Sequence, residues 1–454
     1  MSSAGAGRFS RAGVLAGVRW PLQASILLPL LVALLLRGCL LLLALQATGT
    51  VAVTAGDSAS YLQPARELLD RGCFCVGGQP ELDRTPGYPI FAIATGAASG
   101  HLLPLLLVQI LLSVVSLALV AQLAEVLTGS HRAAVATAWL LAVELLSAEH
   151  AIRVLSETLF VFLLVLLLLA LQRWLDSGSL EFRLLAWPGL CWPAVAALLL
   201  AAMAYVRPVA LVLALPLAVA VPLACSGKGC RRRRWAHGML FLLVFAVAVL
   251  PWTLRNRAVG GYTGFSAVAS RNLYFYVAGD EMAQAQHLSL EQWQQQVGKD
   301  DPARWLRLHP ELQGSSTAAQ SQWLHRQAMQ EIAAHPGRLA LSWLRGELRL
   351  LVAPGTTQLF RLLAVPPGWA WRWPVEAVFA GYLVLVYGLA ALAVVRRRLP
   401  MPQRVLLLLL VAGFLAVSGG GQAISRLRLP VMPMLCLLAG CSFAEPQRPP
   451  ILQP

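Results

Sequence analysis

The sequence lacks the short motifs by which many enzymes bind nucleotides or metals. It contains no Walker loop, no glycine-rich dinucleotide fingerprint and no His-Glu-x-x-His pair, so an enzyme that consumes a nucleotide is not predicted. Its eight cysteines form no Cys-x-x-Cys pair, which argues against a structural zinc site. Cys73 and Cys75 are so close in the chain that we expect no disulfide between them.

Charged residues are also scarce, and apolar residues are abundant. Only 13% of the residues are charged and 58% are hydrophobic, whereas soluble domains carry roughly 25% charged residues. The apolar residues form long blocks such as Leu102 to Leu127 and Leu155 to Leu171, and a membrane-spanning helix needs about 20 mostly apolar residues. The sequence therefore predicts an all-α integral membrane protein.

About ten apolar blocks are predicted to cross the membrane as helices. They run from Leu22 to Gln46, His101 to Leu127, Ala133 to Leu146, Leu155 to Leu171, Leu190 to Tyr205, Val209 to Ala224, Gly238 to Trp252, Val375 to Val395, Val405 to Val417 and Leu429 to Cys441. Tyr88 to Gly100 is expected to be a re-entrant or interfacial piece. Leu339 to Val352 carries three charged residues and is expected to be an interfacial helix.

The net charge of +15 lies largely in short loops beside the apolar blocks, so we expect it to orient the protein and not to bind nucleic acid. With a cytoplasmic N-terminal tail, ten spans place every strongly basic short loop on that same side. The basic residues concerned are Arg8, Arg11 and Arg19, Arg173 and Arg183, Lys228 and Arg231 to Arg234, and Arg396 to Arg398 with Arg404. Both termini are therefore predicted to be cytoplasmic.

Two long segments fall on the other side and divide the chain into three parts. Residues 1–253 form an N-terminal transmembrane module that includes a long extracytoplasmic loop, 47–101. Residues 254–374 form a small, mostly helical extracytoplasmic segment, and residues 375–454 form the C-terminal transmembrane helices. Ala59 to Arg71 is predicted to be a short amphipathic helix, and Glu281 to Val297 and Ser315 to Ala334 are also predicted to be helical.

Asp57 and Tyr61 follow the first span closely, which places them near the outer membrane surface. A carboxylate there can take part in chemistry, but Asp57 also precedes a predicted helix and can simply cap it. The stretch from Asp83 to Pro89 contains two prolines and a glycine, which predict a rigid turn. That turn either holds Arg84 at a set place by the membrane or is a plain junction between loop and helix.

Several arginines lie at the predicted outer ends of spans. One such arginine is explained by its side chain reaching for the interface, but together they share a face with Asp57 and suit a phosphate group. They are Arg207, Arg255 beside Asn256, Arg426 and Arg428, in addition to Arg84. Glu157, at the outer start of the fourth span, is a functional candidate because an acid there needs a partner or water. It can also serve only as a helix-start acid favoured by the dipole.

These motifs, in this order, resemble the membrane glycosyltransferases of the GT-C fold, in particular the bacterial branch related to protein O-mannosyltransferases and the lipid A aminoarabinose transferase. The matching residues are Asp57 with Tyr61, Arg84 to Pro89, Ser156-Glu157-Thr158, Arg207-Pro208, Pro251-Trp252 with Arg255-Asn256, and Arg426-x-Arg428-x-Pro430. Two positions depart from the pattern. Ser58 follows Asp57 where many relatives have a second acid, and Leu427 stands where tyrosine is frequent.

The resemblance implies a sugar donor carried on a polyprenyl phosphate, with chemistry on the outer face of a bacterial inner (plasma) membrane. It implies that Asp57 is the catalytic base or orients the acceptor, and that Arg84 lies near the donor phosphate. We expect the phosphate to be bound by Arg84, Arg255, Arg428, Arg426 and Arg207. We expect the substrates to be bound or oriented by Tyr61, Asp83, Tyr88, Glu157 and Asn256. The sequence identifies no cofactor, and Asp83 and Glu157 are candidates to orient the arginines, to bind sugar hydroxyls or to hold a divalent cation.

Two other classes of function stay open at this point. A transporter or flippase of a lipid-linked substrate often shows internal repeats and charges at the membrane midplane, and no repeat is visible here. In a non-catalytic membrane scaffold the arginines would only anchor the helices. The acceptor of a transferase can be a lipid, a glycan or a protein, and the sequence does not choose among them.

Overall fold

The computed structural model describes residues 24–54, 56–177, 188–224 and 231–445, without the side chains of 188–191 and 231–233. The first predicted residue of the first span, Leu22, lies outside these ranges, as do five residues used to orient the chain: Arg8, Arg11, Arg19, Arg183 and Lys228. Within the described residues the chain is almost entirely helical, which confirms the all-α part of the predicted fold class. The exception is a two-stranded antiparallel hairpin, β1 (Cys75–Val76) and β2 (Gln79–Pro80).

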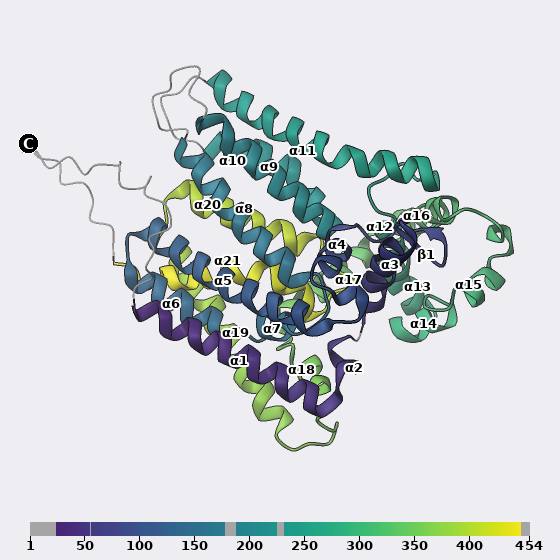
Figure 1. The fold of residues 1–454 in the computed structure, drawn as a ribbon, viewed down its shortest axis with the longest axis horizontal. Coiled ribbons are helices and arrows are strands. Elements are labelled where there is room, and N and C mark those ends of the chain that lie inside the picture. The colour runs from purple at the N-terminus through teal and green to yellow at the C-terminus, as the bar shows by residue number, and fades with distance from the viewer. Residues whose placement is uncertain (1–23, 55, 178–187, 225–230, 446–454) are drawn as a thin grey trace, which may run out of the picture.

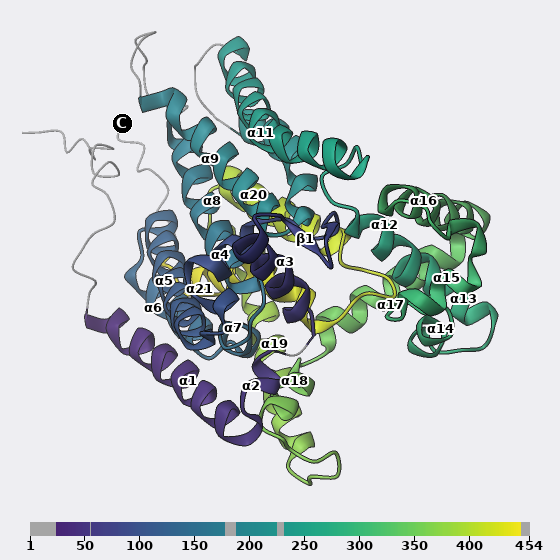
Figure 2. The ribbon, with the colours of Figure 1, turned by 45° about the vertical axis from the view of Figure 1, so that its right-hand side comes forward.

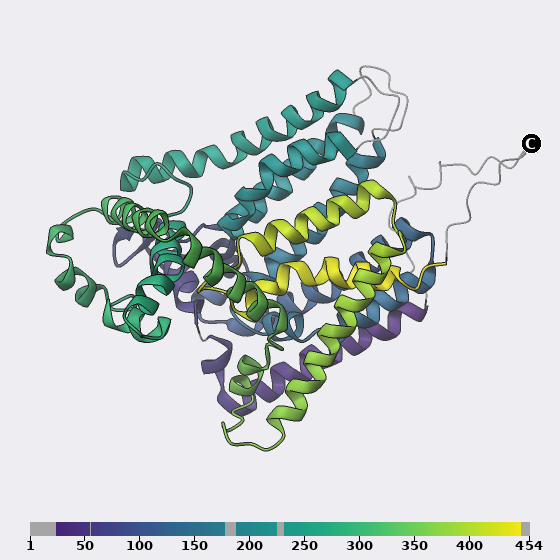
Figure 3. The ribbon, with the colours of Figure 1, turned by 180° about the vertical axis from the view of Figure 1, so that it is seen from behind.

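The apolar helices run alongside one another as a bundle (Figure 1), with α1 and α11 on opposite edges (Figure 2). From behind, α19 to α21 lie toward the viewer (Figure 3). The bundle consists of α1 (Ala24–Thr48), α5 (Leu102–Thr128), α6 (His131–Ala142), α7 (Leu145–Ala151), α8 (Glu157–Ser177), α9 (Pro188–Val206), α10 (Ala214–Ala224), α11 (Arg231–Gly260), α19 (Arg372–Val395), α20 (Met401–Ala416) and α21 (Met432–Cys441).

Five of the described helices, α1, α5, α8, α11 and α19, are each long and apolar enough to cross a membrane, so the chain is a membrane protein. The pair α6 and α7 makes a sixth span if it is counted as one helix bent by 58°. Three further apolar helices are shorter, namely Trp192–Val206, Pro208–Ala224 and Met401–Ala416. The structure thus supports five or six spans, and the count of ten stays a prediction.

Short helices and the hairpin gather at one end of the bundle (right side of Figure 1). The first loop contributes α2 (Thr50–Val53), α3 (Ser58–Arg71), the hairpin, α4 (Gly87–Ala94) and η2 (Ala97–Ser99). The second segment contributes α12 (Val268–Asn272), η4 (Leu273–Ala278), α13 (Gly279–Ala285), α14 (Leu290–Gln296), α15 (Pro302–Leu308), η5 (Pro310–Leu312), α16 (Thr317–Ala334), α17 (Pro336–Val352) and α18 (Thr356–Leu362). It has a small core of its own around Trp293 and Trp305.

The predicted helices in these segments are largely confirmed. Ala59 to Arg71 lies within α3, Ser315 to Ala334 is α16 apart from its first residues, and Leu339 to Val352 lies within α17. The expected helix from Glu281 to Val297 is divided into α13 and α14, because His287 adopts a left-handed conformation (φ 55°) that ends the first helix.

The expectation that Cys73 and Cys75 stay unpaired is wrong. The two residues form a disulfide, and their Cα atoms are 5.4 Å apart. Closeness in sequence does not prevent pairing here because the chain between them spaces the two Cα atoms at a distance typical of disulfides. The pair lies at the start of the β1–β2 hairpin.

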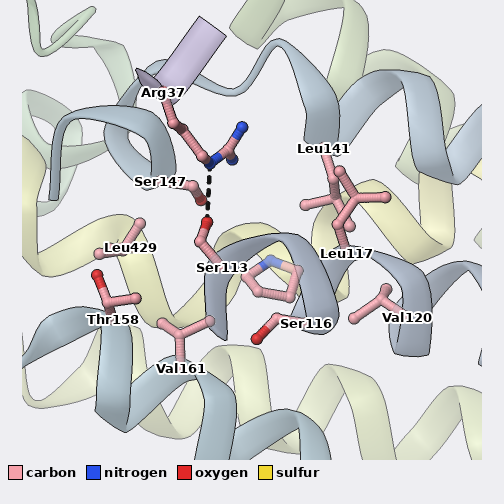
Figure 4. Close-up of a pocket in the computed structure, with 11 residues that line it drawn as sticks. Arg37, Ser113, Ser116, Leu117, Val120, Leu141, Ser147, Thr158, Val161 and Leu429 are labelled. Carbon is pink, nitrogen blue, oxygen red and sulfur yellow. Dashed lines mark hydrogen bonds between the residues drawn. The ribbon is translucent and has the colours of Figure 1, made fainter. Parts of the chain in front are cut away.

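Arg37, in the middle of α1, is fully buried and stabilises the break between α6 and α7. Its Nε donates to Ser113 Oγ (2.9 Å), and its Nη1 donates to the carbonyls of Ala33 (3.1 Å) and Ala142 (3.2 Å). Ala142 ends α6, where carbonyls lose their helical partners. On the other side of the break, Glu144 accepts from the backbone of Ser147 at 2.6 Å. Figure 4 shows Arg37 beside the hydroxyl-bearing side chains of a small buried cavity.

We predict that Arg37→Ala lowers the thermal unfolding midpoint, measured by tryptophan fluorescence in detergent. The substitution leaves the Ser113 hydroxyl and the Ala142 carbonyl without their donor and opens a cavity, which costs about 2 kcal/mol or more. The control is Arg71→Ala, because that side chain is 65% exposed and its loss costs little. Equal midpoints for the two variants would contradict the stabilising role of Arg37.

Candidate active site

A cavity of about 600 Å³ lies where the first loop meets the ends of the bundle helices. Its polar part is lined by Tyr61, Asp83, Arg84, Glu157, Arg207, Asn272, Gln422 and Arg426, and apolar side chains that include Phe160, Val209, Val212, Leu273, Phe414 and Val417 line the rest. Two arginines stand at tight turns that begin the next helix. Arg207 precedes η3 (Pro208–Leu213), and Arg426 lies in η6 (Ser425–Val431).

Asp57 occupies the position before the first residue of α3 but makes no capping hydrogen bond with its side chain. Its Oδ1 accepts from Arg84 Nη2 at 3.0 Å, and its Oδ2 pairs with Arg426 Nη1 at 2.8 Å. The Asp57 side chain is 38% exposed to solvent. The alternative interpretation as a helix-capping carboxylate is therefore wrong for this side chain, which faces two guanidinium groups.

Arg84 is held by the rigid turn that the sequence predicts. Its Nε donates to Ser60 Oγ at 3.0 Å, and its guanidinium lies over the Tyr61 ring, 4.6 Å from the centroid. The turn itself is fastened by Glu81, whose Oε1 accepts from the backbone nitrogens of Asp83 (2.6 Å) and Arg84 (2.8 Å). The Asp83–Arg84 stretch is thus a built part of the site and not a plain junction.

Glu157 begins α8 and is only 2% exposed. Its Oε1 accepts from Arg207 Nη1 at 2.5 Å and also from Arg426 Nε. Since Arg426 contacts both acids, the side chains form one continuous row: Arg84, Asp57, Arg426, Glu157 and Arg207. Three guanidinium groups and the Glu157 carboxylate therefore meet at the polar end of the cavity. Asp57 contacts two of these guanidinium groups from beside the lining.

The contacts within the row favour the charged forms of Asp57 and Arg426. Burial by itself raises the pKa of Asp57, but the charges of Arg426 and Arg84 outweigh it and hold the pKa below its usual value of 3.8. For Arg426, burial disfavours the charged form, yet Glu157 and Asp57 raise the pKa above its usual range. The site therefore contains positive and negative charge side by side, with Glu157 buried and Asp57 partly exposed.

Asp83 also lines the cavity, but its pKa is shifted in the opposite direction to that of Asp57. Its Oδ2 lies 3.6 Å from Arg271 Nε, and its backbone carbonyl accepts from Ser266 Oγ at 2.5 Å. Burial raises the pKa of Asp83, and the charges of Arg271 and Arg84 offset only part of that effect. Asp83 joins the first loop to α12 of the second segment, so the cavity is walled by both of these segments.

Four predicted site residues neither belong to the row nor line the cavity. Arg255 donates to the carbonyls of Glu81 (2.7 Å) and Phe74 (2.6 Å), and Asn256 donates to the carbonyl of Phe265 (3.0 Å). Tyr88 donates to Gln109 Oε1 at 2.8 Å. Arg428 is fully buried, and its Nη1 donates to the carbonyls of Leu350 (2.5 Å), Leu351 (3.1 Å) and Ala353 (2.9 Å). These contacts brace the walls of the site, and those of Arg428 direct its Nη1 to the carbonyls at the end of α17.

The sequence analysis did not single out a buried ion pair in α7 and the turn that follows. Arg153 Nη1 contacts Glu149 Oε1 at 3.1 Å, and Glu149 has no exposed surface. Val154, next to Arg153, donates its backbone N–H to the Val53 carbonyl at 2.8 Å, which ties this turn to the chain just before Asp57. Opposite charges four residues apart in an apolar stretch were the available signal.

Among the described residues, one group of side chains is spaced to hold a metal ion, namely Glu67, Cys73 and Cys75. The two cysteines are joined in a disulfide, so they offer no thiolate ligand. Asp57 and Glu157 both face arginines, and the expected cation at Asp83 and Glu157 stays a prediction.

Comparison with solved structures finds similarity to two oligosaccharyltransferases of an archaeon. AglB from Archaeoglobus fulgidus, in complex with an inhibitory peptide and a dolichol-phosphate, aligns with a TM-score of 0.49 at 14% identity, over 90% of this chain and 50% of its own. The A. fulgidus oligosaccharyltransferase in complex with Zn and sulfate aligns with a TM-score of 0.46 at 13% identity, over 89% and 48%. The chain spans about half the length of each. No family model and no curated protein matches it.

We predict that Gly87→Ala lowers the unfolding midpoint. A Cβ at Gly87 would lie 2.6 Å from the carbonyl oxygen of Tyr205, so the Arg84 turn must move away from the helix that leads to Arg207. Such overpacking costs about 1–3 kcal/mol. Gly337→Ala is the control because no atom lies within 4 Å of its added Cβ. A midpoint for Gly87→Ala at or above that of Gly337→Ala would contradict the close approach.

We also predict a pH-dependent stability difference between wild type and Asp57→Asn. The lowered pKa of Asp57 means that its ion pairs stabilise the folded state above the unfolded value of about 3.9, and that this contribution is lost as the pH falls through the lowered value. The difference in unfolding midpoint should be constant from pH 7 to about pH 5 and shrink below about pH 4. A difference that is the same at pH 7 and pH 3 would contradict the assignment.

Proposed function

We propose that the protein is a membrane glycosyltransferase that moves a sugar from a polyprenyl-phosphate donor to an acceptor, with inversion, on the extracytoplasmic face of a bacterial plasma membrane. One observation carries the proposal. Arg84, Arg207 and Arg426 meet at the polar end of a cavity whose other walls are apolar, with Asp57 between two of them. Such a cavity matches a lipid phosphate, which is an anion attached to a hydrocarbon chain.

The apolar walls account for the lipid part of the donor. Val209 and Val212 lie on the η3 side, and Phe414 and Val417 lie at the end of α20. Hydrocarbon burial is favourable at roughly 25 cal/mol per Å², whereas a soluble phosphate compound gains nothing from these side chains. The combination of walls and charge therefore favours a lipid-linked donor over a free sugar phosphate.

The polar end supplies the chemistry of a single displacement. The acceptor oxygen forms a bond to the anomeric carbon, the bond from that carbon to the phosphate oxygen breaks, and the acceptor proton passes to the Asp57 carboxylate. The departing lipid phosphate gains negative charge, which Arg84, Arg207 and Arg426 stabilise in a partly dehydrated site. Glu157 holds two of these arginines in place.

Other residues of the cavity have supporting roles in this proposal. Asp83 and Asn272 line it from the two extracytoplasmic segments and are placed to bind sugar hydroxyls. Tyr61 supports the Arg84 guanidinium with its ring face. Four further residues support the site indirectly, because they hold neighbouring segments of the cavity walls in place. They are Arg255, Asn256, Tyr88 and Arg428. The acceptor, a lipid, a glycan or a protein, reaches Asp57 from the side of residues 254–374.

We predict that Asp57→Asn lowers sugar transfer by roughly 10²–10⁴-fold, because an amide cannot take the acceptor proton. The assay incubates purified protein in proteoliposomes with a panel of radiolabelled polyprenyl-phosphate sugars and bacterial envelope acceptors. Arg84→Gln and Arg426→Gln should each lower transfer by roughly 10²-fold or more. The control is Arg71→Ala, which changes an exposed charge of the same loop.

Retained transfer in Asp57→Asn would refute the base assignment. Transfer by none of the proteins, combined with movement of the labelled lipid across the bilayer, would favour a flippase instead. Neither transfer nor movement across the bilayer would favour a non-catalytic scaffold.

A further inference from the structure

The guanidinium groups that line the cavity are already engaged with carboxylates. Arg426 uses Nη1 for Asp57 and Nε for Glu157, Arg84 uses Nη2 for Asp57, and Arg207 uses Nη1 for Glu157. A phosphate entering the cavity is recognised by the same N–H groups, since forked guanidinium donors bind carboxylate and phosphate oxygens in the same way. The resident acids and a phosphate therefore compete for one set of donors.

The two acids differ in how readily they can give way. Glu157 is 2% exposed and lies in the first turn of α8, and a buried charge left without its partner is strongly destabilising. Asp57 is 38% exposed, more than either of its arginine partners, Arg84 at 22% and Arg426 at 20%, and an ion pair that water reaches is weaker than a buried one. Loss of its partners thus costs Asp57 little, because water or an acceptor hydroxyl can take their place.

We propose that Asp57 is an exchangeable counter-ion, which the donor phosphate displaces from Arg84 and Arg426, whereas Glu157 is a permanent one. This inference rests on the proposed function and adds an order of events to it. Without donor, both oxygens of Asp57 are held by arginines and the carboxylate is a poor base. With donor bound, Asp57 turns to the acceptor hydroxyl. The donor therefore binds before the acceptor is activated.

The charges of the row balance through the reaction under this assignment. Three arginines and two carboxylates leave one positive charge, which matches the single negative charge of a sugar phosphodiester. The product is a phosphate monoester with a charge of about −1.5 to −2. By then Asp57 has accepted the acceptor proton, so the three arginines and Glu157 leave two positive charges. The row stays near neutral before and after transfer, and no other ion has to enter.

Binding of a short lipid phosphate tests the exchange directly. Farnesyl phosphate is titrated by calorimetry into wild type, Asp57→Asn, Glu157→Gln and Arg426→Gln, with farnesol and inorganic phosphate as the two partial probes. Asp57→Asn should bind farnesyl phosphate roughly three- to tenfold more tightly than wild type, because the competing anion is gone. Arg426→Gln should bind it roughly tenfold or more weakly. Glu157→Gln should not bind it more tightly, because its arginines lose their anchor.

Asp70→Asn is the matched control. It removes the same charge from the exposed end of the same helix, α3, so its affinity should equal that of wild type and exclude an effect of net charge alone. Farnesol should bind all variants equally, which assigns the differences to the phosphate. Tight binding of inorganic phosphate alone would show that the lipid chain is not needed for recognition and would count against the donor class.

Two negative results are distinguishable. If wild type binds farnesyl phosphate better than farnesol but Asp57→Asn binds it equally or more weakly, Asp57 is not displaced and the exchange is wrong. If wild type binds farnesyl phosphate no better than farnesol, the donor class of the proposed function is wrong. Thermal midpoints measured on the same samples show whether each variant is folded.

Discussion

The salt bridge between Arg426 and Glu157 is the contact on which the rest of the site depends. Glu157 is almost fully buried at the head of α8, and a carboxylate in that place is stable only with cations close to it. Two arginines meet this need, one from η3 and one from η6. The ends of three bundle helices must therefore converge, and the cavity opens beside the point where they do. Asp57 joins the cluster through the second face of Arg426.

The residues of the cluster could be predicted from the sequence, but the directions of their side chains could not. Motif order and an outer location singled out Asp57, Glu157, Arg207 and Arg426, and all four meet. Arg428 looked equivalent to Arg426, yet the tight turn of η6 sends the two guanidinium groups to different places. Arg426 faces carboxylates, and Arg428 faces the carbonyls that end α17. Hydropathy places a residue at a membrane surface, but only the turn geometry decides what it faces.

Prediction of the fold from the sequence has the same limit, because apolar composition predicts helices but not where they break. The long apolar blocks predicted a helical membrane protein, which the structure confirms. This prediction needs only the hydropathy of each residue and the length of each block. Breaks inside those blocks are not readable in this way. The bend of 58° between α6 and α7 lies at Val143 and Glu144, inside a predicted span, and the Ala142 carbonyl at this bend accepts from Arg37, which is distant in sequence. Tight turns likewise replace the first residues of two predicted spans, at η3 and η6. Contacts between distant segments, and not local composition, determine these features.

A transferase that uses a carboxylate base beside cationic phosphate ligands faces a conflict, because the ligands that stabilise the leaving group also quench the base. The row of charges in this protein contains a physical solution to that conflict. One acid is buried and keeps the arginines oriented at all times, and the other is exposed and weakly held. Only the second can exchange its partners at low cost. The site thus needs one acid that holds the arginines in place and one acid that can leave them. The exposures assign the first role to Glu157, which is 2% exposed, and the second to Asp57, which is 38% exposed.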